Sequence, residues 1–309
     1  MSHTELALGR ASPPGFDVPD LARRSFRWPL HVRPVELLRL AALGVVVFHA
    51  LAFGLWGPGS DARIYYGADL ADLYPGSIFG DTFVYSPAAA WLIQPFQELP
   101  FAIFRTLVVV LELAGLVYMI GPIFAAVLLL AQFPPLWVEL QQANINLALG
   151  AVLVLGFRQP AWYAAAILTK VTPGVGLVWF AVRREWTALA IAMAATLLIA
   201  LPSLVLHFSA WIDFVRSLAL NAELDAQIGA PLVLRLGLAA VVIVWGALTN
   251  RPWTVLVGAA LTAHVNSAGW LVVLGWARLA MQNRPGAERG QGAVEAGGQR
   301  SSISRHGSS

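Results

Sequence analysis

Apolar runs of about twenty residues recur along most of this chain, and they constrain its fold more than any other feature. An α-helix needs about 20 apolar residues to cross the hydrocarbon core of a bilayer. Only 12% of the residues are Asp, Glu, Lys or Arg, whereas a soluble domain carries about a quarter. The runs are continuous and rich in Leu, Ala and Val, without the alternation of a membrane β-barrel. The sequence therefore predicts an all-α, polytopic membrane helix bundle.

The two ends of the chain differ in composition from the apolar body. Residues 1–33 carry five arginines and no apolar run, so we expect a cytoplasmic leader rather than a cleaved signal peptide. Residues 283–309 are rich in Gly, Ser, Gln and Arg, a composition typical of disorder. A single transmembrane domain is expected over residues 34–282. The basic residues are mostly arginines near helix ends, which indicates the positive-inside rule and not a nucleic-acid partner.

Polar boundaries between the apolar runs predict eight to ten crossings. The first span, Glu36 to Trp56, leaves the cytoplasm if the arginine-rich leader lies inside. Two segments, Tyr85–Pro100 and His207–Pro231, are expected to be juxtamembrane helices along the outer face. Further spans are expected at residues 101–120, 122–137, 145–157, 186–206 and 232–249, and a last broken pair at residues 253–281.

The segment between Arg158 and Arg183 allows two interpretations. Its 24 residues correspond to roughly one membrane thickness, yet both of its ends are basic and belong inside. A broken or re-entrant pair with its apex near Thr169–Gly174, "TKVTPG", would satisfy both facts. The alternative is a single span that departs from the charge rule.

This topology brings three polar segments to the outer side of the membrane. They include "GSDARIYYGADLADLY", which begins at Gly59, and "ELQQANIN", which begins at Glu139. We therefore expect a site that faces outward. The residues that mark the outer side are Asp61, Asn144 and Trp211, and those that mark the inner side are Arg158, Arg183 and Arg251.

Four aspartates follow the first span, and Asp61 stands out among them. Asp61 comes directly after that span, so a helix fixes its height above the membrane. A carboxylate held there could deprotonate an acceptor hydroxyl, and a nearby cation such as Arg63 could stabilise a departing phosphate. Asp69 and Asp72 are expected to be solvated loop residues, while Asp81 stands close to Tyr85 and is a possible second acid.

Lys170 is the only lysine of the chain and lies inside an apolar segment. An ionisable group at membrane depth is costly, which favours a functional role. The alternative is a side chain that extends to the membrane surface, but its position in the middle of the segment leaves little reach to either surface. His264 also lies in an apolar stretch, within "HVNSAGW".

Four stretches resemble family-87 glycosyltransferases, which are polyprenol-phosphate-mannose-dependent mannosyltransferases of the GT-C superfamily. In order, these stretches are "SDARIYY", "FVYSPAAAWLIQPFQELP", "QQANINLALGAVLVLG" and "LTKVTPGVGLVWFAVRREW". The resemblance covers residues 36–190 well and the remainder loosely. The chain reads Gln-Gln-Ala-Asn where the family commonly has Gly-Gln-x-Asn, and its C-terminal half is shorter than usual.

The resemblance implies a GT-C-like fold and a set of site residues. The aspartate of the first outer loop is the proposed catalytic base in such enzymes, and Asp61 matches it, while Lys170 matches the lysine before the proline. Partners implied are a polyprenyl-phosphate sugar donor, a lipid or glycan acceptor and membrane lipids, with no nucleic acid. No cofactor and no metal are expected. The residues expected to bind donor phosphate or substrate are Arg63, Tyr85, Gln142, Asn144, Lys170 and His264.

These features and the resemblance together favour an enzyme in the cytoplasmic membrane that transfers a hexose, most simply mannose, by inverting displacement. A polytopic transporter or lipid flippase is the second hypothesis, because broken helices with charged residues at mid-membrane are typical of transporters. The two halves of the chain show no clear internal symmetry, which counts against the transporter hypothesis. A non-catalytic partner subunit that kept the fold is the third hypothesis.

Overall fold

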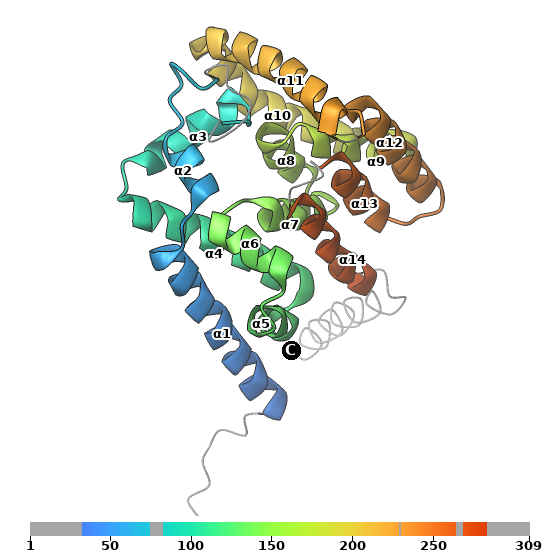
Figure 1. The fold of residues 1–309 in the computed structure, drawn as a ribbon. Helices are drawn as coiled ribbons and strands as arrows, with labels where there is room; N and C mark the ends of the chain where they lie inside the picture. The colour runs from blue at the N-terminus through green and yellow to red at the C-terminus, as the bar shows by residue number, and fades with distance from the viewer. Residues whose placement is uncertain (1–32, 75–82, 229, 264–267, 283–309) are drawn as a thin grey trace, which may run out of the picture.

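The computed structural model describes residues 33–74, 83–228, 230–263 and 268–282, and every regular element within these residues is a helix. The predicted all-α bundle is therefore confirmed (Figure 1). The expected leader, the expected C-terminal tail, Asp81 and His264 lie outside the described residues.

Within the described residues, three helices are long and apolar enough to cross a membrane: α1 (Pro34–Trp56), α4 (Phe101–Ile120) and α10 (Trp186–Leu206). Their bounds agree with the expected spans to within two residues at each end. Five shorter apolar helical segments accompany these three helices. The other elements are α2 (Ser60–Tyr66), α3 (Pro87–Gln97), α7 (Asn146–Gly156), α8 (Tyr163–Thr169), α9 (Leu177–Val182), α11 (Phe208–Ile228), α12 (Leu232–Leu248), α13 (Trp253–Thr262) and α14 (Trp276–Gln282), with 3₁₀ turns η2 (Pro160–Trp162), η3 (Thr172–Gly176) and η4 (Ala268–Gly275).

The span expected at residues 122–137 is not one continuous helix. The structure has two helices there, α5 (Pro122–Leu130) and α6 (Pro134–Gln142), which meet at an angle of 94°. Two prolines begin α6, and proline favours the first turn of a new helix because it has no N–H to donate. The bend brings the end of α6 and the following residues into the bundle, where the sequence analysis expected an outer loop.

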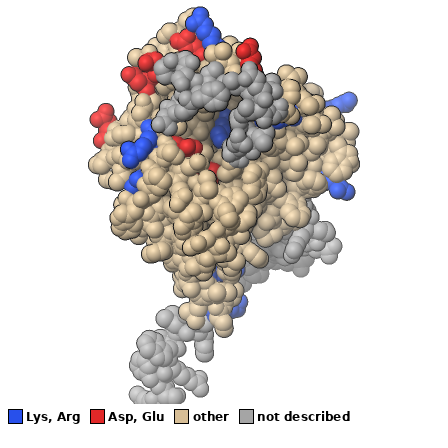
Figure 2. Space-filling model, viewed as in Figure 1, with Lys and Arg blue, Asp and Glu red and all other residues tan. Residues whose placement is uncertain are grey.

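Helix α1 faces its surroundings with apolar side chains over most of its circumference. Only 33% of its apolar window is buried inside the bundle, and it packs against α4 and α5. The close contact with α4 requires glycine at position 54, because a Cβ atom there would lie 2.7 Å from the Thr106 hydroxyl. Figure 2 shows charged side chains mainly over the upper half of the molecule, with a broad uncharged surface below them. These are the features of a helical membrane protein.

The segment between Arg158 and Arg183 is broken at its expected apex. Helix α8 ends at Thr169 and η3 begins at Thr172. Phe157, at the beginning of the segment, contacts the rings of Trp179 and Phe180 near its end, at 5.5 and 6.3 Å between centroids. The two ends therefore lie together, which agrees with the re-entrant interpretation and not with a single span.

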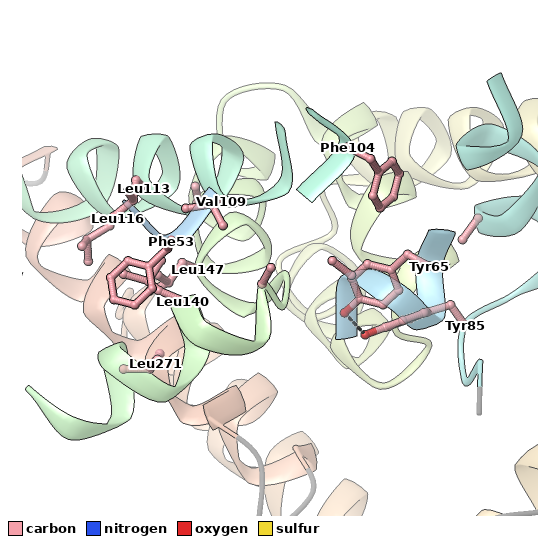
Figure 3. Close-up of a cluster of buried hydrophobic side chains, with 14 of the residues drawn as sticks. Phe53, Tyr65, Tyr85, Phe104, Val109, Leu113, Leu116, Leu140, Leu147 and Leu271 are labelled. Carbon is pink, nitrogen blue, oxygen red and sulfur yellow. Dashed lines mark hydrogen bonds between the residues drawn. The ribbon is translucent and has the colours of Figure 1, made fainter. Parts of the chain in front are cut away.

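A cluster of buried apolar side chains joins α4, α6 and α7 (Figure 3). Leu113 and Leu116 of α4, Leu140 of α6 and Leu147 of α7 are each at most 1% exposed. At one end of this cluster Tyr65 and Tyr85 place their hydroxyl groups together (Figure 3). The apolar core thus ends at a pair of polar groups, and the candidate site begins there.

The topology can be tested with single cysteines, because the chain has none of its own. Asp69, Arg184 and Asn250 are exposed, and Arg183 donates to Asn250 at 3.1 Å, which keeps the last two positions on one side. We expect Asp69→Cys to react with a membrane-impermeant maleimide in intact cells. Arg184→Cys and Asn250→Cys should react only after permeabilisation, and reaction at position 184 in intact cells would contradict the topology.

Candidate active site

Asp61 lies in the first turn of α2, and the residues just before α2 are bonded to α6 and to α4. Gly59 precedes α2 with φ +60°, a conformation that favours glycine, and its N–H donates to the carbonyl of Gln141 in α6 at 2.9 Å. Arg105 of α4 donates to the carbonyl oxygens of Gly54, at 2.7 Å, and Gly57. These bonds satisfy carbonyls at the end of α1 that have no helical partner. The position of the Asp61 carboxylate is thus fixed by α1, α4 and α6 together.

Asn144 holds the Asp61 carboxylate directly. Its Nδ2 donates to Oδ2 of Asp61 at 2.5 Å. Its Oδ1 accepts from the N–H of Ile145 at 2.7 Å and from the hydroxyl of Tyr65 at 3.3 Å. Because the Asn144 side chain is bonded at both its nitrogen and its oxygen, the orientation of the carboxylate is constrained from the side of α6.

Two tyrosines continue this network away from Asp61. The hydroxyl groups of Tyr65 and Tyr85 lie 2.8 Å apart. Burial raises the pKa of both phenols, and the nearby Asp61 carboxylate raises the pKa of each further. Both therefore stay protonated at neutral pH, so the Tyr65 hydroxyl donates to Asn144 and the Tyr85 hydroxyl can donate to Tyr65.

Lys170 lies at the break between α8 and η3 and points toward the same region. Its ammonium donates to Oδ1 of Asn146 at 2.6 Å and lies 6.0 Å from the centre of the Tyr85 ring. Ser86 caps α3, and its hydroxyl donates to the carbonyl of Leu168 at 2.5 Å. This bond ties the segment that holds Tyr85 to the segment that holds Lys170.

Two buried glutamates lie behind Lys170, at the beginning of α7. Glu139 accepts from the N–H and the Nδ2 of Asn146, at 2.9 and 3.1 Å. Glu112 accepts from the N–H groups of Leu147 and Ala148, at 3.2 and 3.1 Å. Both glutamates are 0% exposed. The first N–H groups of a helix have no helical acceptor, and carboxylates there are stabilised by the helix dipole.

Asp61 and Lys170 line one cavity of about 320 Å³. Tyr85, Asn144 and Asn146 also line it. The cavity therefore contains a carboxylate, an ammonium group, a phenol and two amides, a set that can bind a polar, anionic substrate. Its remaining lining residues are Val84, Leu149, Val171, Thr172, Pro173, Leu218, Ala259, Thr262, Ala263, Gly269 and Val272.

Arg63 does not line this cavity, although the sequence analysis placed it beside Asp61. Two positions along a helix correspond to a rotation of roughly 200° about its axis, so the two side chains lie on nearly opposite faces. The Arg63 guanidinium lies 4.6 Å from the centre of the Phe101 ring and lines a second cavity with Asp69 and Asp72. Gln142 is half-buried at the end of α6 and is likewise absent from the lining of the Asp61 cavity.

Four residues of this region were not predicted as site residues from the sequence: Tyr65, Glu112, Glu139 and Asn146. Glu112 is the only acidic residue between Phe101 and Ile120, and a lone acid in an apolar span is a signal that could have identified it. The other three appear in the quoted segments, but nothing in their spacing distinguishes them from solvated loop residues. The bend before α6 buries Glu139 and Asn146, and that bend was not predicted.

Comparison with protein families places the chain. A family model described as Glycosyltransferase family 87 matches residues 83–296, more than two thirds of the chain. The chain belongs to glycosyltransferase family 87. Searches among curated proteins and among solved structures gave no match.

Membership of glycosyltransferase family 87 makes the chain a membrane glycosyltransferase, and it does not favour the transporter hypothesis. The matched region includes Tyr85, Asn144, Asn146 and Lys170, whereas Asp61 precedes it. Asp61 of α2 is joined to the matched region by its hydrogen bond with Asn144.

The bond between Asn144 and Asp61 can be tested in this family-87 glycosyltransferase. We expect Asn144→Ala to lower the sugar-transfer rate by about 10- to 100-fold, the size of loss seen when a residue that orients a metal ligand is removed. Gln142→Ala is the matched control, since Gln142 precedes Asn144 by two residues and does not line the cavity. Equal losses in initial transfer rate for the two variants would contradict a specific role of Asn144.

Proposed function

We propose that this protein transfers a hexose, in the simplest case mannose, from a polyprenyl-phosphate donor to a lipid or glycan acceptor on the outer side of the cytoplasmic membrane. The observation that carries the proposal is the placement of Asp61 and Lys170 in one cavity. A direct displacement needs a base for the acceptor hydroxyl and a cation for the departing phosphate.

In the proposed reaction the acceptor oxygen attacks the anomeric carbon of the donor sugar. The bond between that carbon and the phosphate oxygen breaks, and its electron pair leaves with the lipid phosphate. The hydroxyl proton passes to the Asp61 carboxylate, while the Lys170 ammonium stabilises the charge on the phosphate. A single displacement inverts the anomeric configuration. Asn144 holds the carboxylate in one orientation throughout.

An apolar groove of about 390 Å³ supports a lipid-linked donor. It runs along α3 and α4 and is lined by Ile93, Phe96 and Leu111, with Tyr85 shared between the groove and the Asp61 cavity. Phe96 and Leu111 are 50% and 55% exposed, so the groove is open to the outside of the bundle. A polyprenyl chain in this groove would place its phosphate near Tyr85, with hydrocarbon against hydrocarbon.

The role of Asp61 is tested by Asp61→Asn, which keeps the shape of the side chain and an oxygen for Asn144. The amide cannot take the acceptor proton, and loss of a general base costs about 10²–10⁴ in rate. The assay combines purified protein, radiolabelled polyprenyl-phosphate mannose and native membranes that lack the protein.

Asp69→Asn and Asp72→Asn are the matched controls for Asp61→Asn, because both residues are exposed and line the second cavity. Their rates should stay near that of the unmodified protein. Near-normal transfer by Asp61→Asn together with loss of transfer by Asp81→Asn would show that Asp81, and not Asp61, is the base. Absence of transfer by the unmodified protein would favour the non-catalytic hypothesis.

The groove is tested by Ile93→Trp, which fills its middle with a larger apolar side chain. We expect the KM for the polyprenyl donor to rise by about tenfold, as expected when roughly 1.4 kcal/mol of binding is lost, with a smaller change in kcat. Leu92→Trp is the matched control, since Leu92 is 48% exposed and does not line the groove. Equal KM values for the two variants would place the lipid chain elsewhere.

A further inference from the structure

Asn146 stands between Lys170 and the buried carboxyl group of Glu139. Lys170 donates to Oδ1 of Asn146 at 2.6 Å, and Nδ2 of the same amide donates to Oε2 of Glu139 at 3.1 Å. Glu139 also accepts the backbone N–H of Asn146 at 2.9 Å. The three side chains thus form a chain of hydrogen bonds that ends at the cavity.

Glu139 determines which way the Asn146 amide faces. A carboxylate only accepts hydrogen bonds, so it selects the NH₂ end of the amide and leaves the oxygen end for Lys170. The reversed amide would set its NH₂ group against the ammonium, which has no acceptor. The location of the Lys170 charge therefore depends on Glu139, although the two side chains are joined through a third.

Glu139 also reaches the Asp61 side of the cavity through its backbone. The N–H of Asn144 donates to the Glu139 carbonyl at 3.3 Å, in the turn that ends α6. Ala143 in that turn has φ +52°, so the chain reverses sharply between Glu139 and Asn146. One residue of α6 is consequently bonded to both Asn144 and Asn146, which hold the two charged groups of the site.

We propose that Glu139 is a positioning residue of the transfer reaction, which orients Asn146 so that its oxygen holds the Lys170 ammonium in the Asp61 cavity. This proposal rests on the proposed function, in which Lys170 stabilises the leaving phosphate. A neutral amide between the two charges has a specific advantage. A direct ion pair with Glu139 would occupy the ammonium with a full negative charge, whereas an amide oxygen fixes its place and leaves its charge for the phosphate.

Glu112 provides a matched control for a purely structural role. It is as fully buried as Glu139 and also accepts N–H groups at the beginning of α7. Its carboxyl group interacts electrostatically with that of Glu139, and it accepts from Leu147 and Ala148 and not from the Asn146 amide. Glu112→Gln keeps an oxygen for one of the two N–H groups of α7 and sets its NH₂ group where the second oxygen accepted.

The test is a double-mutant cycle on the transfer rate with Glu139→Gln and Lys170→Met. Glutamine at position 139 donates where the carboxylate accepted, so the Asn146 amide loses its fixed orientation. Glu139→Gln should lower the rate about 10- to 100-fold in the unmodified protein and less than about twofold in the Lys170→Met background, because residues that act as one unit are not additive. Glu112→Gln should give the same loss in both backgrounds.

Two outcomes of this cycle would overturn the proposal. One is an equal loss for Glu139→Gln in both backgrounds, which would mean that Glu139 only supports the fold. The other is a normal rate for Lys170→Met, since there would then be no effect to transmit. Thermal unfolding of each purified variant separates loss of folding from loss of rate.

A second measurement does not depend on activity. Because Lys170 is the only lysine, labelling with [ε-¹⁵N]lysine gives a single side-chain resonance. Glu139→Gln and Asn146→Ala should both shift this Nζ resonance, and Glu112→Gln, which acts on Lys170 only through its electric field, should shift it less than either. If the unmodified protein transfers no sugar, the proposed function fails while this resonance still decides the positioning role. An unchanged resonance in Glu139→Gln would overturn that role.

Discussion

Helix α7 begins inside an apolar bundle, and the N–H groups of its first turn must find acceptors there. Unsatisfied backbone groups in hydrocarbon cost several kcal/mol each. Glu112 and Glu139 supply the acceptors for Asn146, Leu147 and Ala148. Burying two carboxyl groups is itself costly unless donors and a cation compensate them. The single lysine of the chain lies within electrostatic reach of both glutamates. The requirement of one helix end thus accounts for much of the polar architecture around the site.

The site consists of a charged cavity next to an apolar groove, with Tyr85 at the boundary. A substrate that is half carbohydrate phosphate and half hydrocarbon fits this division, because each half meets a surface of its own kind. The break at Lys170 is what makes the arrangement possible. A continuous helix would place the lysine on a lateral face, whereas the end of α8 presents it to the beginning of α7.

The parts of this structure that follow from local rules could be predicted from the sequence. The bounds of α1, α4 and α10 follow from apolar length, and the break near Lys170 follows from a Thr-Pro-Gly sequence between two basic ends. The topology predicted Asp61 and Asn144 on the same side of the membrane. The hydrogen bond between their side chains is a closer contact than the topology alone requires.

The failures of prediction have a common physical origin in tertiary geometry. The sharp bend before α6 depends on how α5 packs, so Glu139 and Asn146 were expected in an outer loop and are in fact buried. Arg63 was placed beside Asp61 because the two are close in sequence, but the short helix α2 separates them by half a turn. Neither error could be avoided without knowing which surfaces the neighbouring helices cover.

The connection between α1 and Asp61 has a consequence for the surrounding lipid. A helix of 23 residues, about 34 Å long, adapts to bilayers of different thickness mainly by changing its tilt. Only Gly57 to Gly59 separate α1 from α2, and Arg105 bonds that junction to α4. A change in the tilt of α1 would therefore move the Asp61 carboxylate. We therefore expect transfer in reconstituted vesicles to have an optimum in acyl-chain length, and a rate that is flat across chain lengths would show that the junction absorbs the motion.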